Sequence, residues 1–235
     1  MMLSNRLQTI GGYVPKGSRL ADIACDHAQL ARALVLADQV DLAIAADLRS
    51  EPLRRARRAA AEEMIQSGRL LFRQGDGLTV LAPGECDVVV IAGVGGKLIE
   101  QMLKARPEVA QAAGRLILSP QRSPWLVRQW AQDQGYAIYD EQVVMEDGYF
   151  YEIIVLDKVS EPKGLSPLDI RLGPVIAQGR DSLSRTYLAW RKAADQRALA
   201  KMALAAAGHP TVGEKMISLE AIWKEWEKRY GYSDA

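Results

Sequence analysis

Acidic side chains follow two of the short apolar runs in the chain, and they give the first indication of chemistry. Asp22 and Asp26 flank the end of the run 20–25, and Asp47 follows the run 42–46. Ligands of parallel α/β sheets bind at the carboxyl ends of strands, so these acids should meet in one crevice. A phosphate site would need glycines and no acid, and the G-x-G-x-x-G pattern is absent. The acids favour a cationic ligand without phosphate, such as the amino group and sulfonium of S-adenosylmethionine.

Two acids also have a purely structural explanation, and a third is weakly specific. Asp26 could cap the helix that follows it, because a carboxylate there accepts hydrogen bonds from free backbone N–H groups. Asp47 suits a ribose diol, which dehydrogenases and methyltransferases both bind. Asp76, within Gln74-Gly75-Asp76-Gly77, could accept from the adenine amine of the cofactor or could belong to an ordinary Asp-Gly turn.

Two further loops should face the same crevice. Ala92-Gly93-Val94-Gly95-Gly96 follows the apolar run 87–92, and its glycines allow the backbone to bend and to approach a ligand. Methyltransferases acting on exocyclic amines often carry Asp/Asn-Pro-Pro-aromatic at this place, which the chain lacks. A ring nitrogen with its own lone pair would need less help from this loop. In Ser119-Pro120-Gln121, Gln121 could bond a base edge or be a plain polar loop residue.

These loops belong to a regular alternation of strands and helices. Apolar runs typical of strands stand at 20–25, 42–46, 70–73, 87–92 and 115–118, and helical patterns at 27–37, 51–67, 97–105 and 125–134. Such alternation predicts an α/β fold with a mostly parallel sheet. Two more strand-like runs, 136–145 and 149–156, flank an acidic-glycine turn and predict an antiparallel hairpin. Seven strands ending in a hairpin are the layout of a Rossmann-like class I S-adenosylmethionine methyltransferase.

A linker with prolines and glycine divides the chain. We expect a Rossmann-like methyltransferase catalytic domain over 1–160 and a C-terminal α-helical, antiparallel coiled-coil domain over 161–235. The helical region is interrupted at Gly208-His209-Pro210. Apolar spacings of three and four predict coiled-coil-like seams on either side of the interruption, at Leu183, Tyr187, Trp190 and Ala194, and at Met216, Leu219, Trp223, Trp226 and Tyr230.

The net charge hides an asymmetry. The whole chain has 30 Lys and Arg against 29 Asp and Glu, but residues 1–157 carry 17 basic against 20 acidic side chains. Residues 158–235 carry 13 basic against 9 acidic. The basic excess in the helical region is either a nucleic-acid surface or a solvated face. The cluster Arg54-Arg55 and Arg57-Arg58 is interpreted as a solvated face.

Several classes of protein are excluded by composition. Two cysteines, Cys25 and Cys86, do not make a disulfide framework, and two histidines do not make a multi-histidine metal site. No apolar run is long enough to span a membrane, and the first residues lack the pattern of a signal peptide. We therefore expect a cytoplasmic protein with no metal and no membrane partner. The oligomeric state is open, with a monomer favoured.

Six blocks of residues together resemble one family. They are 3–9 (Leu-Ser-Asn-Arg-Leu-Gln-Thr), Ala21-Asp22-Ile23 with Asp26-His27-Ala28, 73–78 (Arg-Gln-Gly-Asp-Gly-Leu), Ile91-Ala92-Gly93 with Gly95-Gly96, Glu146-Asp147-Gly148 with Tyr151-Glu152, and Leu172-Gly173-Pro174. Over about residues 3–176 the chain resembles the bacterial tRNA (adenine-22-N1)-methyltransferases. The resemblance implies methyl transfer from S-adenosylmethionine to N1 of adenine 22 in the D-arm region of tRNA.

The resemblance and the residue pattern together assign a set of site residues. Asp26 and His27 are the expected catalytic pair, with Asp26 holding the amine of the target base and His27 either shaping the pocket or contacting the base. Cofactor binding is expected of Asp22, Ala24, Asp26, His27, Asp47, Leu48, Asp76, Gly77, Ala92 and Gly93. Contact with tRNA is expected of Arg6, Gly95, Gly96, Gln121, Arg180, Arg185, Arg191 and Lys192.

The chain departs from the family pattern at three places. Ala24 replaces a glycine of the cofactor loop, Val94 replaces a methionine, and Ser119-Pro120-Gln121 stands where Gln-Pro-Asn is usual. Other functions therefore stay open. One is an S-adenosylmethionine methyltransferase acting on another RNA position, a small molecule or a protein. Another is a non-catalytic RNA-binding module with a vestigial cofactor pocket. A dehydrogenase is the least favoured, because the glycine fingerprint is missing.

Overall fold

The computed structural model describes the backbone of residues 3–205 and 210–231, and the side chains of 3–203 and 218–231. The chain divides into two compact units, residues 1–163 and 164–235. In the part of the chain that the structure covers, no helix is long and apolar enough to cross a membrane.

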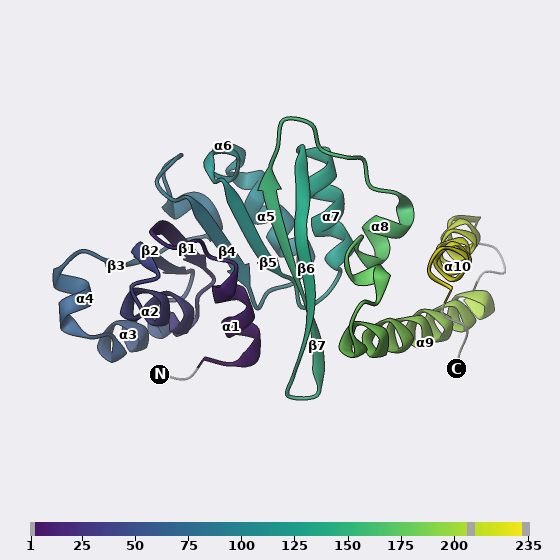
Figure 1. Ribbon diagram of the computed structural model, residues 1–235, viewed down its shortest axis with the longest axis horizontal. Coiled ribbons are helices and arrows are strands. Elements are labelled where there is room, and N and C mark those ends of the chain that lie inside the picture. The colour runs from purple at the N-terminus through teal and green to yellow at the C-terminus, as the bar shows by residue number, and fades with distance from the viewer. Residues whose placement is uncertain (1–2, 206–209, 232–235) are drawn as a thin grey trace. The chain divides into compact units, whose positions relative to one another are not determined.

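The first unit is a seven-stranded sheet with helices on both faces (Figure 1). The strand order is β3-β2-β1-β4-β5-β7-β6, with β1 to β5 parallel and β7 antiparallel to both β5 and β6. The strands are β1 (Ser18–Ile23), β2 (Val40–Asp47), β3 (Leu70–Gln74), β4 (Val88–Ala92), β5 (Arg115–Ser119), β6 (Tyr136–Glu146) and β7 (Tyr149–Lys158). This confirms the predicted fold class.

The helices of the first unit cover the sheet in two layers. They are α1 (Asn5–Gly12), α2 (Gln29–Leu36), α3 (Ser50–Ala59), α4 (Glu62–Gln66), the short 3₁₀ helix η1 (Gly77–Val80), α5 (Gly96–Ala105), α6 (Pro107–Ala112) and α7 (Pro124–Asp133). One core layer joins α5, α6 and α7 to the sheet, and the other joins α1, α2 and α3 to the opposite face.

The buried strands explain the apolar runs in the sequence. Strand β4 is buried on both faces, so its alternate residues enter opposite core layers. Val89 and Ile91 pack in the layer with α5, α6 and α7, and Val88 and Val90 pack in the layer with α1, α2 and α3. Burying an aliphatic side chain contributes about 1.5–3 kcal/mol. A strand in this position therefore needs apolar residues throughout, which explains the continuous apolar run in the sequence.

Two predicted helix boundaries differ from the structure. The single helix expected over 51–67 is two helices, because Ala60 and Ala61 take extended backbone conformations. The carbonyl of Ala59 accepts a hydrogen bond from the Arg32 guanidinium instead of continuing the helix. Helix α6 was not expected, although Pro107 at its start is a residue that suits the first helical turn.

A buried ionic cluster ties the hairpin to α7. Arg128 Nε donates to Glu141 Oε1 at 2.6 Å, and Arg128 Nη2 donates to Glu152. All three side chains are almost completely buried. Burial lowers the pKa of Arg128, but the two carboxylates outweigh it and raise the pKa overall. A charge held this way fixes α7, β6 and β7 together, since losing one partner would leave charges buried alone.

The second unit is helical. It contains α8 (Pro167–Leu172), the 3₁₀ helix η2 (Ile176–Gln178), α9 (Ser182–Ala205) and α10 (Pro210–Tyr230). A capping box starts α8, in which Ser166 and Asp169 exchange side-chain and backbone hydrogen bonds. Helix α10 meets α9 where Lys192 pairs with Glu227 at 2.7 Å and Trp223 Nε1 donates to Asp195 at 3.1 Å.

The coiled-coil prediction for these helices is wrong in two respects. The buried positions of α9 are Ser184, Tyr187, Leu188 and Asp195, while Trp190 is 49% exposed. Figure 1 shows α10 end-on where α9 lies across the view, so the helices cross and do not share a long seam. The reason is that α10 also packs on η2, where Trp226 Nε1 donates to the Ala177 carbonyl at 2.8 Å. The predicted seam residue Met216 and the interruption at 208–209 lie outside the described residues.

Candidate functional site

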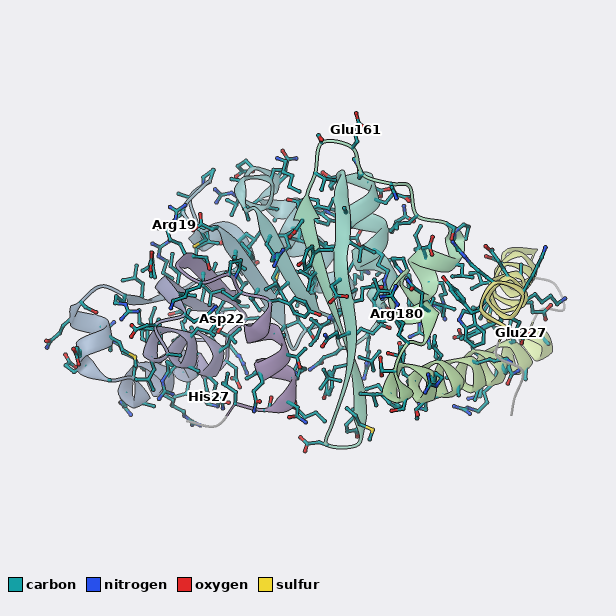
Figure 2. All side chains as sticks on the ribbon, in the orientation of Figure 1. Arg19, Asp22, His27, Glu161, Arg180 and Glu227 are labelled. Carbon is teal, nitrogen blue, oxygen red and sulfur yellow. The ribbon has the colours of Figure 1, made fainter. Side chains whose placement is uncertain are left out.

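A cavity of about 620 Å³ opens at the carboxyl ends of the parallel strands, which is a usual size for a small-molecule site. Figure 2 shows β1 running from Arg19 to Asp22, with His27 beyond its end. All ten residues expected to bind a cofactor line this cavity: Asp22, Ala24, Asp26, His27, Asp47, Leu48, Asp76, Gly77, Ala92 and Gly93. Of those expected to contact tRNA, Arg6 and Gln121 line it.

The loop after β1 has an unusual backbone. Ala24, Asp26 and Ala28 all have positive φ, at 56°, 49° and 50°. An L-residue in this conformation costs on the order of 1–2 kcal/mol, so the loop stores strain at the cavity wall. Cys25 N donates to the Ala46 carbonyl at 3.0 Å and holds the loop against the end of β2.

Asp26 is not a helix cap. Helix α2 begins at Gln29, and its N-cap residue Ala28 makes no side-chain capping bond. The Asp26 carboxylate instead accepts from Arg49 Nη2 at 3.2 Å and lies 3.6 Å from His27 Nε2. Asp26 and His27 are therefore brought together at the mouth of the cavity, as the predicted pair requires, and both remain about half exposed.

Asp47 is one of two buried acids of the site. Its Oδ2 accepts from the Asp26 backbone N–H at 3.1 Å and its Oδ1 from the Arg49 backbone N–H at 2.9 Å. The Arg49 side chain, 67% exposed, reaches both Asp47 and Asp26. The sequence prediction missed Arg49, because nothing in a run of surface arginines distinguishes the one that bridges two carboxylates. A second cavity, also about 620 Å³, is lined by Arg49 and continues over Glu51 and Arg55.

Asp22 is the other buried acid of the site. Burial raises its pKa to about 7, a hydrogen bond from the Ala31 N–H lowers it in part, and the charge of Asp47 raises it further. Burial also raises the pKa of the Cys25 thiol, which lines the same cavity and carries no thiolate character at neutral pH. Asp22 is therefore poised to change its charge near neutrality, when a cation enters.

Arg6 comes to the cavity from α1. Its Cζ lies 4.6 Å from the centre of the Tyr151 ring, and its Nε lies 3.5 Å from Glu146 Oε2. The side chain is only 17% exposed, and Nε and Nη1 are buried without a hydrogen-bond partner among the described residues. Ser4 caps α1 by accepting from the Leu7 N–H at 3.4 Å, which sets the direction in which Arg6 leaves the helix. Ser4 and Leu7 also line the cavity and were not predicted.

The glycines of the two remaining loops have different roles. A Cβ at Gly93 would meet nothing within 4 Å, so this glycine opens the cavity, and its φ of 83° suits only glycine. Gly96 is buried, and a Cβ there would lie 2.4 Å from the Ser123 carbonyl oxygen. The assignment of Gly96 to tRNA contact is corrected, because the residue packs helix α5 against the next loop. Gly95 does not line the cavity either.

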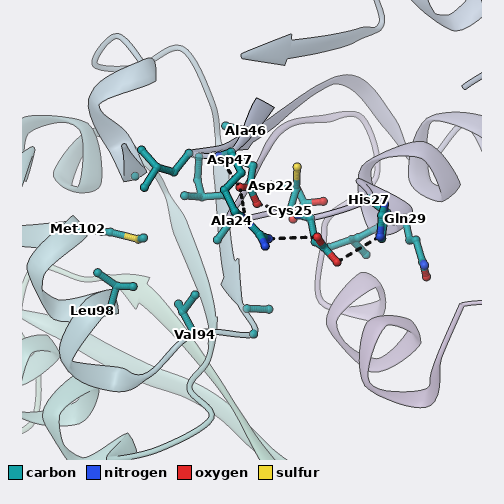
Figure 3. A pocket seen from close by; sticks show the side chains of 18 of the residues that line it. Asp22, Ala24, Cys25, His27, Gln29, Ala46, Asp47, Val94, Leu98 and Met102 are labelled. Atoms are coloured by element: carbon teal, nitrogen blue, oxygen red, sulfur yellow. Dashed lines mark hydrogen bonds and ion pairs between the residues drawn. The ribbon is translucent and has the colours of Figure 1, made fainter. Parts of the chain in front are cut away.

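The opposite side of the cavity is apolar. Figure 3 shows Val94, Leu98 and Met102 gathered away from Asp22 and Cys25. Gly77 has a φ of 52°, and a Cβ there would lie 2.7 Å from Met102. The carboxylate of Asp76 is exposed at the rim, where the backbone carbonyl of the same residue accepts from the Thr79 N–H at 3.0 Å. A flat ring could thus lie between apolar side chains and a rim acceptor.

The basic residues predicted to contact tRNA fall into two groups in the second unit. Arg180 and Arg185 are exposed around the start of α9, where Arg180 Nε donates to Gln178 and Arg185 Nη1 donates to the Gly179 carbonyl. Arg191 is 11% exposed and contacts Asp195 and Tyr187, so little of its side chain is available for the expected contact with tRNA. Lys192 is paired with Glu227.

The donors and acceptors of the cavity fit S-adenosylmethionine. Four carboxylates line it, two of them buried, which suits a cationic nucleoside and not a phosphate. Arg6 also lines the cavity, and its buried N–H donors without a hydrogen-bond partner among the described residues offer a site for an acceptor. Among the described residues, no group of three or more His, Cys, Asp or Glu is arranged to hold a metal ion.

Comparisons with known proteins point the same way. The profile of the methyltransferase domain matches residues 3–154. The tRNA (adenine(22)-N(1))-methyltransferase of Bacillus subtilis is 36% identical over 187 residues, which cover 78% of each chain. The solved structure of the B. subtilis m1A22 tRNA methyltransferase matches with a TM-score of 0.81 at 30% identity, covering 94% of this chain and 98% of that one.

A third match is a ligand complex. A candidate tRNA (m1A22) methyltransferase of Streptococcus pneumoniae, solved with S-adenosyl-L-methionine, gives a TM-score of 0.77 at 28% identity and covers 94% of this chain and 99% of that one. The fold, the acidic cavity and these relatives agree. The chain belongs to the methyltransferase-domain family and, within it, to the tRNA (adenine(22)-N1)-methyltransferases.

Proposed function

We propose that this protein transfers the methyl group of S-adenosylmethionine to N1 of adenine 22 in the D-arm region of tRNA. The observation that carries the proposal is the cavity itself, in which Asp22, Asp26, Asp47 and Asp76 surround a space of about 620 Å³ at the strand ends. Membership of the family supplies the base and its position.

Each wall of the cavity has one task toward the cofactor. Asp47, held by two backbone N–H groups, is oriented to accept from ribose hydroxyls, and Asp76 at the rim accepts from the adenine amine. Asp22 faces the cationic amino group. Ala92 and Gly93 provide an open wall beside the reacting centre. When bound, S-adenosylmethionine supplies a methyl group on a positively charged sulfur.

The chemistry asks little of the protein beyond positioning. The N1 lone pair of neutral adenine is already a nucleophile, so no strong base has to create it. Aligning N1 with the methyl carbon and sulfur accounts for several kcal/mol of barrier reduction in reactions of this kind. We assign Asp26 to hold the exocyclic amine of the target and to stabilise the positive charge that grows on the ring, while His27 shapes the pocket beside it.

The target base has to leave its pair. N1 lies on the Watson–Crick edge, so the adenine must be unpaired or flipped out before it can reach the cavity. Arg6 has buried N–H donors without a hydrogen-bond partner among the described residues. An acceptor on the target base would bond them and offset the cost of their desolvation. Gln121, whose backbone N–H is bonded to the Val94 carbonyl at 2.9 Å, is placed to contact the same base.

The helical domain over 161–235 is proposed as the tRNA handle. The exposed pair Arg180 and Arg185 carries this role, since both guanidiniums are anchored at the η2–α9 junction. Replacing both by alanine should remove about two phosphate contacts and reduce the slope of log affinity against log salt by about 2. The matched control is the double alanine variant of Arg57 and Arg58, exposed on α3. Equal salt slopes for the parent protein and both double variants would show that the helical domain does not contribute to tRNA binding.

Transfer of label from S-adenosylmethionine tests the proposed function. Unmodified tRNA, total cell protein and a pool of small metabolites are offered separately as methyl acceptors. Stable incorporation only into tRNA is the expected outcome. Labelling of protein or of a small molecule would favour the second candidate, a methyltransferase with another substrate. Because tRNA resides in the cytoplasm, we propose that location for the protein.

A further inference from the structure

The β6–β7 hairpin extends beyond the rest of the sheet (Figure 1). Strand β7 is antiparallel to β5 and to β6, so β6 points in the same direction as the five parallel strands. The turn after Glu146 therefore lies at the carboxyl edge of the sheet, the edge at which the cavity opens. The tip of this hairpin is consequently a neighbour of the site.

The tip presents a bare aromatic ring. Tyr149 is 68% exposed, the largest exposure among the bulky hydrophobic residues described. Tyr149 is paired across the strands with Glu146, and Tyr151 with Val144. Because every second residue of a strand faces the same way, Tyr149, Tyr151 and Glu146 share one face of the hairpin. Met145, half exposed, lies on the other face.

This face leads directly to the cavity. Arg6 covers the Tyr151 ring at 4.6 Å, contacts Glu146 and is one of the residues that line the cavity. Tyr149 is the next residue on that face, about 7 Å farther along the strand. Stacked bases are spaced about 3.4 Å apart, so this distance corresponds to one or two nucleotides from a base held beside Arg6.

We propose that Tyr149 is a stacking platform for a tRNA base one or two nucleotides from the target adenine. This inference rests on the proposed function and adds a positioning residue to it. Extruding a nucleotide leaves its neighbours partly unstacked, and an exposed aromatic ring can replace the lost stacking. Charge does not carry the contact, since Glu146 is compensated by Arg6 and the next residue, Asp147, is exposed and acidic. The hairpin tip engages base faces and not phosphates.

Binding of unmodified tRNA by three variants tests this role. Loss of a base–aromatic stack weakens binding by about 1–3 kcal/mol, so Tyr149→Ala should raise the tRNA Kd by about 5- to 150-fold. Tyr149→Phe keeps the ring and should bind within about twofold of the parent. The matched control is Tyr139→Ala, on the neighbouring strand β6 toward the opposite end of the hairpin, where the ring is 59% exposed beneath the Arg115 guanidinium at 4.2 Å. That control should bind like the parent.

Two further readouts separate stacking from other causes. The salt slope of Tyr149→Ala should equal that of the parent, because no phosphate contact is lost, and its Kd for S-adenosylmethionine should not change. Unchanged tRNA affinity, a reduced salt slope, or loss of a self-associated species in sedimentation would each overturn the proposal. A parent protein that methylates no tRNA refutes the proposed function instead, and an active parent with an unaffected Tyr149→Ala variant refutes only the stacking role.

Discussion

Asp22 makes cofactor binding depend on pH. Burial raises the pKa of its carboxyl from 3.8 to about 7, and the single hydrogen bond from the Ala31 N–H does not compensate. A carboxyl whose pKa is raised to about 7 carries a penalty on the order of 4 kcal/mol for being charged in the free protein. A cationic group in the cavity removes much of that penalty, because an opposite charge favours the ionised carboxylate.

The sign of the effect follows from the direction of the shift. Below pH 7 the carboxyl is mostly protonated in the free protein, so a cofactor that requires the ionised form must first expel a proton. With a pKa of about 7, about one molecule in eleven is ionised at pH 6, and the apparent Kd should be about tenfold above its plateau. At pH 8 about ten in eleven are ionised, and the affinity should level off.

Calorimetric titration of S-adenosylmethionine at pH 6, 7 and 8 measures this dependence. Repeating the titration at pH 6 in buffers of different ionisation enthalpy counts the protons released, for which we expect about 0.9. His27 lines the same cavity, so the decisive control is Asp22→Asn, which should bind weakly and lose the pH dependence. A parent Kd that is constant from pH 6 to 8, or an equal slope in Asp22→Asn, would refute the assignment of Asp22 to the cationic amino group.

Three other predictions follow from the loop, the catalytic pair and the buried cluster. Asp26→Asn should lower turnover at least about tenfold, or about 1.4 kcal/mol of barrier, with an unchanged melting curve; near-normal turnover would remove Asp26 from the mechanism. Ala24→Gly should raise the free energy of unfolding by up to about 1 kcal/mol, because it relieves a φ of 56° at some entropic cost, and a loss of stability in urea titration would contradict this. Arg128→Ala should cost about 3–5 kcal/mol, since it leaves Glu141 and Glu152 buried without their cation; a loss below about 1 kcal/mol would show that the cluster contributes little.

The strands of the sheet were predictable from sequence because burial dictates their composition. Strands with both faces covered need apolar residues at every position, and the acidic-glycine turn after residue 146 marks the hairpin. The cavity was predictable because residues at the carboxyl ends of parallel strands converge, whatever the details of the helices. The binding roles of those residues stay a prediction, and the assays above test them.

The helical domain shows where this reasoning fails. A seam through Trp190 assumed that the buried face of α9 is its apolar face, yet the structure buries Asp195 and most of Arg191. Paired charges and hydrogen bonds, such as that from Trp223 to Asp195, make such burial possible, and spacing alone does not reveal them. The role of Arg49 was not predicted for a similar reason, since the fold determines that Asp26 and Asp47 are its partners.

The central claim is tested most directly by position-specific methylation. Two transcripts of one tRNA, with adenine or guanine at position 22, are incubated with the protein and labelled S-adenosylmethionine, and reverse transcription then maps N1-methyladenine as a stop. We predict label and a stop at position 22 only in the adenine transcript. Equal labelling of both transcripts, a stop elsewhere, or no labelling of either would contradict the account.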